Sequence, residues 1–486
     1  MAADYKTPGV YIEEIPKLPP SIASVQTAIP AFIGYTERAP DEKEPGSAVT
    51  RPVKISSMFE FQQFFTNPSL PASAQAPQPA PNEKGLSVTI DLTSSTPTVV
   101  TKTTKLMPTF MMYYALQLFF DNGGGDCYIV SVDTYANKPL PLEADLEAGL
   151  AEIEKLFDVT LIVFPDAMSL SKDSYYALYA KAIDQCARLK DRFTVMDVWI
   201  DDTPVAAGNP PHDNVADLRN ANLVQQPENL KYAAVYYPRI YADVDYVYAD
   251  ADVALKVTDD KGAVVFTGTL DAAKKGFNNF YFMAKAAIAD YNILLPVSAA
   301  AVGVYASVDG SRGVWKAPAN VSIIDAIKPE ISITNDKQQT LNVDPNDGKS
   351  INVIRSFPGR GPAFIWGART LAGNDNEWRY ISVRRFFTMV ETSVKNAAEQ
   401  FVFEPNDENT WTRIKAMIEN FLTQQWKAGA LMGASTKEAF FVHIGLGQTM
   451  TELDIWEGRM IIQIGMAAVR PAEFIILQFM HKMLSE

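Results

Sequence analysis

Cysteine and histidine are scarce in this chain of 486 residues, which contains two cysteines and three histidines. Cys127 and Cys186 lie on predicted core elements, so buried free thiols are favoured over a disulfide or a reactive site. The histidines, His212, His443 and His481, are far apart in the sequence, and no pair of them has the spacing of metal ligands. We therefore expect neither a metal centre nor a cofactor.

A membrane-spanning run is also missing. The N-terminus lacks a basic region followed by an apolar run, so no signal peptide is predicted. The one uncharged stretch long enough to cross a bilayer, residues 291–308, contains Asn292 and Pro296 and is interpreted as strand, loop and strand. We expect synthesis in the cytosol and no direct insertion into a membrane.

Basic residues are outnumbered by acidic ones, and the imbalance is confined to one part of the chain. The whole sequence has 43 Lys and Arg against 57 Asp and Glu, a net charge of −14. Residues 351–486 hold 14 of each sign, so residues 1–350 carry the whole acidic excess. Because nucleic-acid backbones are bound by clustered Lys and Arg, we expect no nucleic-acid partner.

Catalytic motifs are absent as well. The Gly-rich stretch 122–126 precedes a predicted strand, whereas a phosphate-binding loop lies between a strand and a helix. His212 with Asp213 could form half of a metal site, but a loop or helix N-cap role for Asp213 is favoured. Asp201 and Asp202 follow the end of a strand, where a solvated loop is again the favoured interpretation. The sequence gives no support for an enzyme.

Buried strands alternate with amphipathic helices over residues 110–349. That order favours an outer α/β domain with a mostly parallel sheet. A β-hairpin around Asp260–Gly262 is predicted as an insert over about residues 241–280. The predicted strands lie near 126–133, 159–167, 193–200 and 233–240, and the predicted helices over 142–157 and 174–189.

The flanking regions differ from this pattern. Residues 21–109 begin the body, and they contain a Pro-rich loop (67–85) and then a Thr-rich segment that predicts an exposed pair of strands. Residues 350–486 predict a C-terminal α+β domain. Its helices are expected over 383–400 and 408–427, and its strands over 438–446, 458–466 and 472–483.

Both ends of the chain are β-prone. Residues 1–20 read as an extended arm, in which Gly9–Ile12 is followed by Pro16, Pro19 and Pro20. An unpaired strand edge recruits other chains, and a contact of this kind that does not close on itself builds a helical filament. Pairing of both ends within the same subunit explains the pattern equally well, so the residues alone leave the two alternatives open.

A series of segments resembles, in the family's order, the tail sheath proteins of contractile phage tails and related contractile injection systems. The resemblance is spread along most of the chain, although residues 40–110 and 241–290 show no clear family pattern. The matching segments are TPGVYIEEI (7–15), AIPAFIGYTERAP (28–40), LPVSAAAVGVYASVDGSRGVWKAPAN (295–320), SINVIRSFPGRGPAFIWGARTLAG (350–373), WRYISVRRFF (378–387), VFEPNDENTW (402–411) and RPAEFI (470–475).

This resemblance implies a structural subunit of a contractile sheath. Such a chain polymerises helically around an inner tube and contracts to drive the tube through a target envelope. The implied partners are further copies of the chain, an inner tube protein, and baseplate and terminal cap proteins of a phage tail-like particle. A non-contractile filament or shell protein that uses the same strand exchange is the alternative.

The resemblance also implies roles for particular residues. The domain over 350–486 would face the tube, and its sheet would be completed by strands from neighbouring subunits. The strand-exchange candidates are Gly9, Val10, Tyr11, Ile12, Glu13, Glu14, Met460, Ile461, Ile462, Ile464, Phe474, Ile475, Ile476, Leu477 and Phe479. The candidates for a basic, tube-facing surface are Arg384, Arg385, Lys395, Arg413 and Lys415, for which solvated helix faces with local ion pairs are the alternative.

Overall fold

The computed structural model of the chain describes residues 22–40, 51–66, 86–92, 97–102, 107–135, 137–203 and 212–478. The backbone groups into two compact units. The body comprises Gln26–Met389 and Arg470–Glu486, and the small unit comprises Met1–Val25 and Val390–Val469. The chain therefore passes from one unit to the other after residues 25, 389 and 469.

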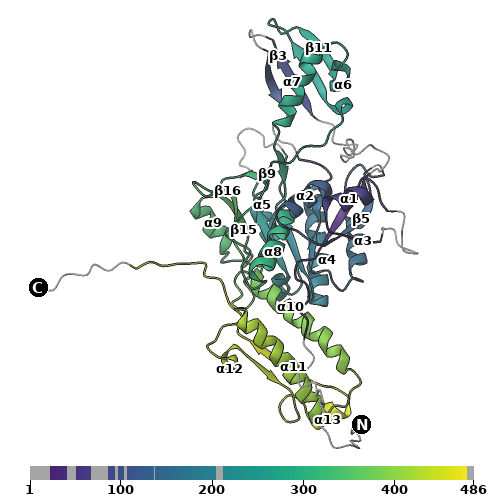
Figure 1. Cartoon of the computed structure of the whole chain (residues 1–486). Coiled ribbons are helices and arrows are strands. Elements are labelled where there is room, and N and C mark those ends of the chain that lie inside the picture. The colour runs from purple at the N-terminus through teal and green to yellow at the C-terminus, as the bar shows by residue number, and fades with distance from the viewer. Residues whose placement is uncertain are drawn as a thin grey trace, which may run out of the picture. The chain divides into compact units, whose positions relative to one another are not determined.

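The body is built on a nine-stranded sheet (Figure 1). Its central strands, from β15 to β5, run parallel, and the pairings at the two edges are antiparallel. The predicted α/β character is thereby confirmed. The strand order is β13 (Val321–Ser322), β16 (Gly361–Trp366), β15 (Asn352–Phe357), β8 (Ala233–Tyr237), β7 (Phe193–Asp197), β6 (Leu161–Val163), β1 (Pro30–Thr36), β5 (Cys127–Thr134) and β2 (Val53–Ile55).

Helices cover both faces of this sheet because successive side chains of a strand point to opposite sides. In β1, Phe32 belongs to the cluster formed with α2 (Met112–Asp121) and α8 (Ser298–Arg312). Its neighbours Ala31 and Ile33 belong to the other cluster, with α3 (Glu143–Ile153) and α4 (Lys172–Leu189). A strand buried on both sides must be apolar throughout, and every residue of β1 is buried.

Helix α8 corrects the prediction made for residues 291–308. The segment forms the short strand β12 (Ile293–Leu295) and then α8, where strand, loop and strand were expected. A Cβ atom at Gly303 would lie 2.5 Å from the backbone oxygen of Phe119, so only glycine allows α8 to lie this close to α2. Because α8 is buried almost all round, its sequence lacks the apolar stripe that marks a surface helix.

Two segments far apart in the sequence form one insert. The predicted hairpin is β10 (Ala254–Thr258) with β11 (Val264–Thr269), and the predicted Thr-rich pair is β3 (Ser87–Asp91) with β4 (Thr98–Lys102). Strand β3 pairs in parallel with β10, so the sheet order is β11-β10-β3-β4. Helices α6 (Leu270–Ala273) and α7 (Asn278–Ala289) accompany this sheet (Figure 1).

The remaining elements of the body are short. A three-stranded antiparallel sheet has the order β12-β9-β14, with β9 at Ile240–Ala242 and β14 at Ala326–Pro329. Three further helices are α1 (Met58–Phe65), α5 (Asn214–Asn220) and α9 (Asn335–Asn342). Single turns of 3-10 helix lie at Pro165–Ser169, Pro227–Tyr232, Asp250–Asp252 and, in the small unit, Glu399–Phe401.

The small unit begins within a helix, which corrects the predicted boundary at residue 350. Helix α10 (Ile381–Ala398) contains the division between Met389 and Val390. Residues 350–389 belong to the body because β15 and β16 extend its large sheet. The small unit contains α11 (Glu408–Lys427), α12 (Thr436–Ala439), β17 (Phe440–His443), α13 (Glu452–Trp456) and β18 (Gln463–Met466).

Three local predictions are confirmed, for the cysteines, for Asp213 and for the Gly-rich stretch. Cys127 and Cys186 are free and buried. Asp213 is the N-cap of α5, with its side chain accepting from the backbone N–H of Ala216. The Gly-rich stretch 122–126 turns the chain from α2 into β5. Among the helices of the described ranges, none is both long and apolar enough to cross a bilayer.

Two buried carboxyl groups lie at the carboxyl ends of parallel strands. Burial raises the pKa of Asp166 to about 7, even though its carboxylate accepts backbone N–H groups of Tyr35 and Met111. Burial also raises the pKa of Asp197 to about 6, although that carboxylate accepts the N–H groups at the start of α8. Both groups are therefore easier to protonate in the folded chain than in the unfolded chain.

The stability of the body should consequently fall as the pH rises. Both folded pKa values exceed the ordinary value of 3.8, so the stabilisation is complete below that pH and is lost as pH rises through 6 to 7. A pKa difference of one is worth about 1.4 kcal/mol, so we expect the free energy of unfolding to drop by roughly 4 kcal/mol between pH 5 and 8. Urea denaturation measures this drop. Asp197→Asn should show a smaller one, and an equal slope in the variant would contradict the assignment.

Candidate assembly site

The small unit carries a β-ribbon of two strands, β17 and β18. They pair antiparallel, with Phe440 opposite Met466 and His443 opposite Gln463. Val442 and Phe440 are buried on the side of α11, whereas Phe441 and His443 are exposed. Within the described ranges no third strand joins this sheet, so both of its outer edges are open to pairing. Isolated two-stranded sheets are marginally stable in water, and a further strand would stabilise this one.

The outer face of the ribbon is shaped by Gly465. A Cβ atom there would lie 2.2 Å from the ring of Phe441 on the opposite strand. Phe441 keeps 45% of its surface exposed although it lies across the ribbon. The strand-exchange candidates Met460, Ile461, Ile462 and Ile464 lie in or just before β18 and are exposed or half-buried. By the register of the ribbon, its outer face carries Phe441, His443, Gln463 and Gly465 and is only partly apolar, whereas Ile464 lies opposite Val442 on the face towards α11.

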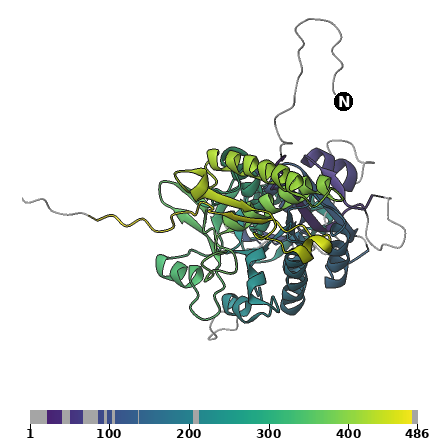
Figure 2. The ribbon, with the colours of Figure 1, turned by 90° about the horizontal axis from the view of Figure 1, so that it is seen from below.

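The C-terminal segment does not form the strand predicted over 472–483. Residues 470–478 have no regular structure and are drawn as a plain trace in Figures 1 and 2, while 479–483 lie outside the described residues. Four consecutive apolar side chains, those of Phe474, Ile475, Ile476 and Leu477, are each at least 72% exposed. The sequence is β-prone, but none of the described strands pairs with residues 470–478, and backbone pairing is what defines a strand.

The beginning of this segment is fixed to the body. Arg369 donates from Nε to Oε1 of Glu473 at 2.9 Å and from Nη2 to Oε2 at 2.5 Å. The hydroxyl of Tyr380 donates to the same carboxylate at 3.3 Å, and Arg470 donates to the carbonyl oxygen of Asn376 at 2.6 Å. We call Arg470–Glu473 the arm root and the residues from Phe474 onward the C-terminal arm.

Arg369 is also supported by polar contacts outside the arm root. Its Nη1 donates to the carbonyl oxygens of Asn342 and Gly373, at 3.3 Å each. Lys349, 8% exposed, lies in the same loop region and donates from Nζ to three carbonyl oxygens at the C-terminal end of α5. A lysine ammonium has three donors and matches three acceptors, and it also complements the negative end of a helix.

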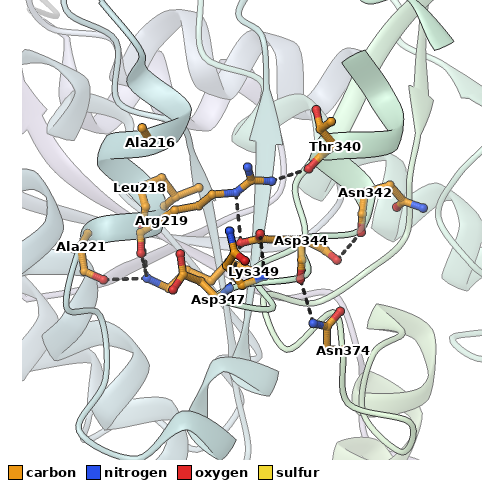
Figure 3. Close-up of polar contacts among 12 residues, drawn as sticks. Ala216, Leu218, Arg219, Ala221, Thr340, Asn342, Asp344, Asp347, Lys349 and Asn374 are labelled. Carbon is orange, nitrogen blue, oxygen red and sulfur yellow. Dashed lines mark hydrogen bonds and ion pairs between the residues drawn. The ribbon is translucent and has the colours of Figure 1, made fainter. Parts of the chain in front are cut away.

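Asp344 organises the loop that carries Lys349. Its carboxylate accepts backbone N–H groups of Asn346 and Asp347 and pairs with Arg219 of α5 at 3.2 Å. Its carbonyl oxygen accepts from the side chain of Asn374 at 2.8 Å, which links the loop to residues next to the arm root (Figure 3). The loop is thus tied both to α5 and to the segment that holds Arg369.

Arg384 and Arg385 are corrected as candidates for a tube-facing surface. They are 3% and 4% exposed, so neither presents its charge to a partner in this structure. Arg384 stacks on Trp378, with its guanidinium carbon 4.4 Å from the ring centroid. Arg385 pairs with Asp309 of α8 through two hydrogen bonds, of 3.1 and 2.5 Å. Helix α10 buries both side chains because its first half lies in the body.

The other basic candidates lie on exposed faces of the small unit. Lys395 is exposed on α10, and Arg413 and Lys415 lie on α11. Arg413 is 4.0 Å from Glu404 and Lys415 is 3.9 Å from Glu419, both at solvent-exposed positions. Such surface pairs contribute little to stability, so these cations remain available to a partner. The candidates Gly9, Val10, Tyr11, Ile12, Glu13, Glu14 and Phe479 lie outside the described residues.

Comparison with known proteins identifies the family. The sequence model of the phage tail sheath C-terminal domain matches residues 373–481, a range that includes α10, α11, the ribbon and the arm root. The sheath of PVC, an extracellular contractile injection system, solved in its contracted state, is 30% identical with a TM-score of 0.61, and the match covers 99% of each chain. The chain belongs to the tail sheath family of contractile injection systems.

Two further relatives agree with this sheath assignment. The contracted helical sheath of the anti-feeding prophage is 30% identical with a TM-score of 0.61, over 98% of this chain and 100% of that one. The tail sheath protein of Vibrio phage KVP40 is 27% identical over 137 residues. That match covers 28% of this sheath chain and spans only 20% of the phage protein.

Sequence reasoning missed the residues that hold the arm root. Arg369 and Glu473 lie 104 positions apart, and each belongs to a segment that resembles the family without any sign that they pair. Lys349 was likewise not singled out. The local signal that could have pointed to Lys349 is its position directly before the buried run 350–354, because a charged side chain next to a buried segment needs hydrogen-bonding partners.

Proposed function

We propose that this sheath chain polymerises helically around an inner tube and contracts to drive the tube through a target envelope. The observation that carries the proposal is the full-length likeness to two sheaths solved in the contracted state, at 30% identity. The proposed partners are further copies of the chain, an inner tube protein, and baseplate and cap proteins. A role in binding the baseplate is supported by the likeness to a chain of the anti-feeding prophage baseplate, which is 30% identical over 99% of this chain.

The open ribbon and the exposed arm support strand exchange between subunits as the joint. The two features are complementary. In the described chain the ribbon has strand edges that pair with no further strand, and the arm has a β-prone sequence that pairs with no described strand. Four consecutive apolar side chains are typical of a strand that is covered on both faces. The N-terminal candidates Gly9–Glu14 would supply a second donated strand. Contraction would then be a rearrangement between linked subunits, and no nucleotide is required.

The exposed cations Lys395, Arg413 and Lys415 remain our candidates for contact with the tube. Arg384 and Arg385 are no longer included, because both are engaged inside the body. The non-contractile filament or shell has less support, since the two full-length sheath relatives were solved as contracted assemblies. We propose a phage tail-like particle, assembled in the bacterial cytoplasm or released from the cell, as the place of action.

Removal of residues 474–486 should abolish sheath assembly. A donated strand forms backbone hydrogen bonds, each worth about 1 kcal/mol net, and it also buries apolar side chains, so its loss removes several kcal/mol per joint. The measurement is electron microscopy of sheaths formed by the full chain with its tube and baseplate proteins. A chain lacking residues 1–15 tests the other joint.

The control for this deletion is Lys437→Ser, a change at an exposed position of α12 away from the arm. Normal sheaths from the 474–486 deletion would show that the C-terminal arm is not a joint. Sheaths that form but occur in a single length, with no contracted form under any trigger, would favour the non-contractile alternative.

A further inference from the structure

The arm root and the described part of the arm differ in their contacts with the body. Glu473 is half-buried and is held by Arg369 and Tyr380, whereas Phe474, the next residue, is 72% exposed. Exposure alternates along the root, where Arg470 and Ala472 are exposed, and it is continuous from Phe474 to Gln478. Glu473 is therefore the last residue of the described chain that is partly enclosed by the body.

Arg369 is prepared for this contact by groups outside the arm. It is 3% exposed, and its backbone N–H and C=O are both bonded to the side chain of Asn352, at 2.8 Å each. Its Nη1 is held by the carbonyl oxygens of Asn342 and Gly373. These contacts leave Nε and Nη2 for the arm, and this edge of the guanidinium is the one that binds a carboxylate with two parallel hydrogen bonds.

The position of the root in the sequence determines which unit would bear a force that pulls on the arm. The chain leaves the small unit after Val469 and rejoins the body at Arg470. The C-terminal arm is thus attached to the body, whereas the ribbon proposed to receive a donated strand belongs to the small unit. A force that pulls on a donated arm would act on the large sheet through the contact between Glu473 and Arg369. It would reach the connection between the two units, after Val469, only if that contact gave way.

We propose that Arg369 and Glu473 form a latch that fixes the origin of the C-terminal arm, so that only residues from 474 onward are free to enter a neighbouring subunit. This inference rests on the proposed strand exchange. A fixed origin shortens the flexible tether and restricts where the arm can reach, which raises its effective concentration at the receiving edge of a second copy. Arg369 is accordingly a positioning residue and does not itself enter the joint.

The test compares Glu473→Ala with Glu228→Ala, a matched change at an exposed position of the body outside the arm. Hydrogen exchange of the purified full chain should become several-fold faster at residues 472–474 in Glu473→Ala, while Glu228→Ala and the peptides of the large sheet stay unchanged. In assembly with tube and baseplate proteins, Glu473→Ala should need roughly fivefold more chain to form half of the sheaths. Arg369→Gln should have the same effect, and combining the two changes should add little, as expected for partners in one contact.

The outcomes separate the latch from the proposed function. If deletion of 474–486 abolishes assembly while Glu473→Ala assembles and exchanges like Glu228→Ala, the latch is wrong and strand exchange stands. If the deletion assembles normally, strand exchange itself fails. Tyr380→Phe removes one donor to Glu473 without leaving a charge unpaired, so it should give an intermediate assembly defect; normal assembly of this variant and of Glu473→Ala together would overturn the latch.

Discussion

Replacing Asp309 with alanine is expected to destabilise the folded chain by about 3 to 5 kcal/mol, the usual cost of removing one partner of a buried ion pair. Asp309 and Arg385 have side chains that are 7% and 4% exposed, respectively. The arginine would stay buried among α8, α10 and Thr27 with no anion to balance it. Such a loss is a large share of the stability of an ordinary domain.

The same pair connects three distant parts of the sequence, which is why the effect should spread beyond one helix. Thr27 donates its hydroxyl to Asp309 at 2.6 Å, and its carbonyl oxygen accepts from Arg385 at 2.9 Å. Arg385 also lies over the ring of Tyr305, at 4.7 Å from its centroid. The pair therefore holds the start of the described chain to the helix α8 and to the first half of α10.

Thermal and urea unfolding of Asp309→Ala measure this effect. The control is Glu377→Ala, which removes an exposed carboxylate of the same unit and should change stability by less than about 0.5 kcal/mol. Asp309→Asn keeps the shape and two hydrogen-bonding atoms, so it should fall between the two. Equal stability of Asp309→Ala and Glu377→Ala would show that water or a counter-ion compensates Arg385.

Lys349→Met should cost about 3 kcal/mol of unfolding free energy. Methionine fills a similar volume but cannot donate, so the three carbonyl oxygens at the end of α5 lose their partner while they stay covered, and each loss costs about 1 kcal/mol or more. Burial lowers the pKa of Lys349, and the nearby carboxylates of Asp347 and Asp344 oppose that shift. The carboxylates of the loop thus partly offset the cost of burying the ammonium.

Urea denaturation of Lys349→Met, beside the exposed control Lys275→Met, tests this expectation. The variant has a second predicted consequence, because the loop of Lys349 and Asp344 adjoins the residues that hold Arg369. Hydrogen exchange should therefore quicken in residues 342–349 before it does so in the large sheet. A variant as stable as Lys275→Met would show that water replaces the ammonium at α5.

Four strands of the large sheet, β5 to β8, were predictable because their pattern is local. Strands such as 159–167 and 193–200 are mostly apolar runs between amphipathic helices, and that alternation specifies layers whatever the distant residues are. Helix α8 was not predictable in the same way. Residues 298–304 are small or β-branched and all buried, so they have no helical stripe, and the carboxylate that accepts the first N–H groups of the helix comes from Asp197, a hundred positions earlier.

The other features of the fold were harder to predict because they depend on pairing between residues that are far apart in the sequence. The two halves of the insert were each recognisable as strands. Their parallel pairing, which places Ser87 opposite Ala254, has no signal in the sequence near either strand. The arm showed the opposite case: residues 472–478 have strand-forming sequence, but the structure describes no strand there. A strand is defined by its pairing, and the sequence pattern alone does not say where a pairing partner lies. Arg384 and Arg385 were misassigned since a helix's charge pattern does not reveal that its first half is enclosed.

The two cysteines have a practical consequence for following the arm. Burial raises the pKa of the Cys186 thiol to about 12 and that of Cys127 still further, so neither forms an appreciable thiolate at neutral pH. Thiol reagents react with thiolates, and these are the chain's two cysteines. A cysteine introduced at Ile475 would thus be labelled selectively in the otherwise unaltered protein. One fluorophore there would report, by its change in polarity, the moment when an arm passes from water into a neighbouring subunit.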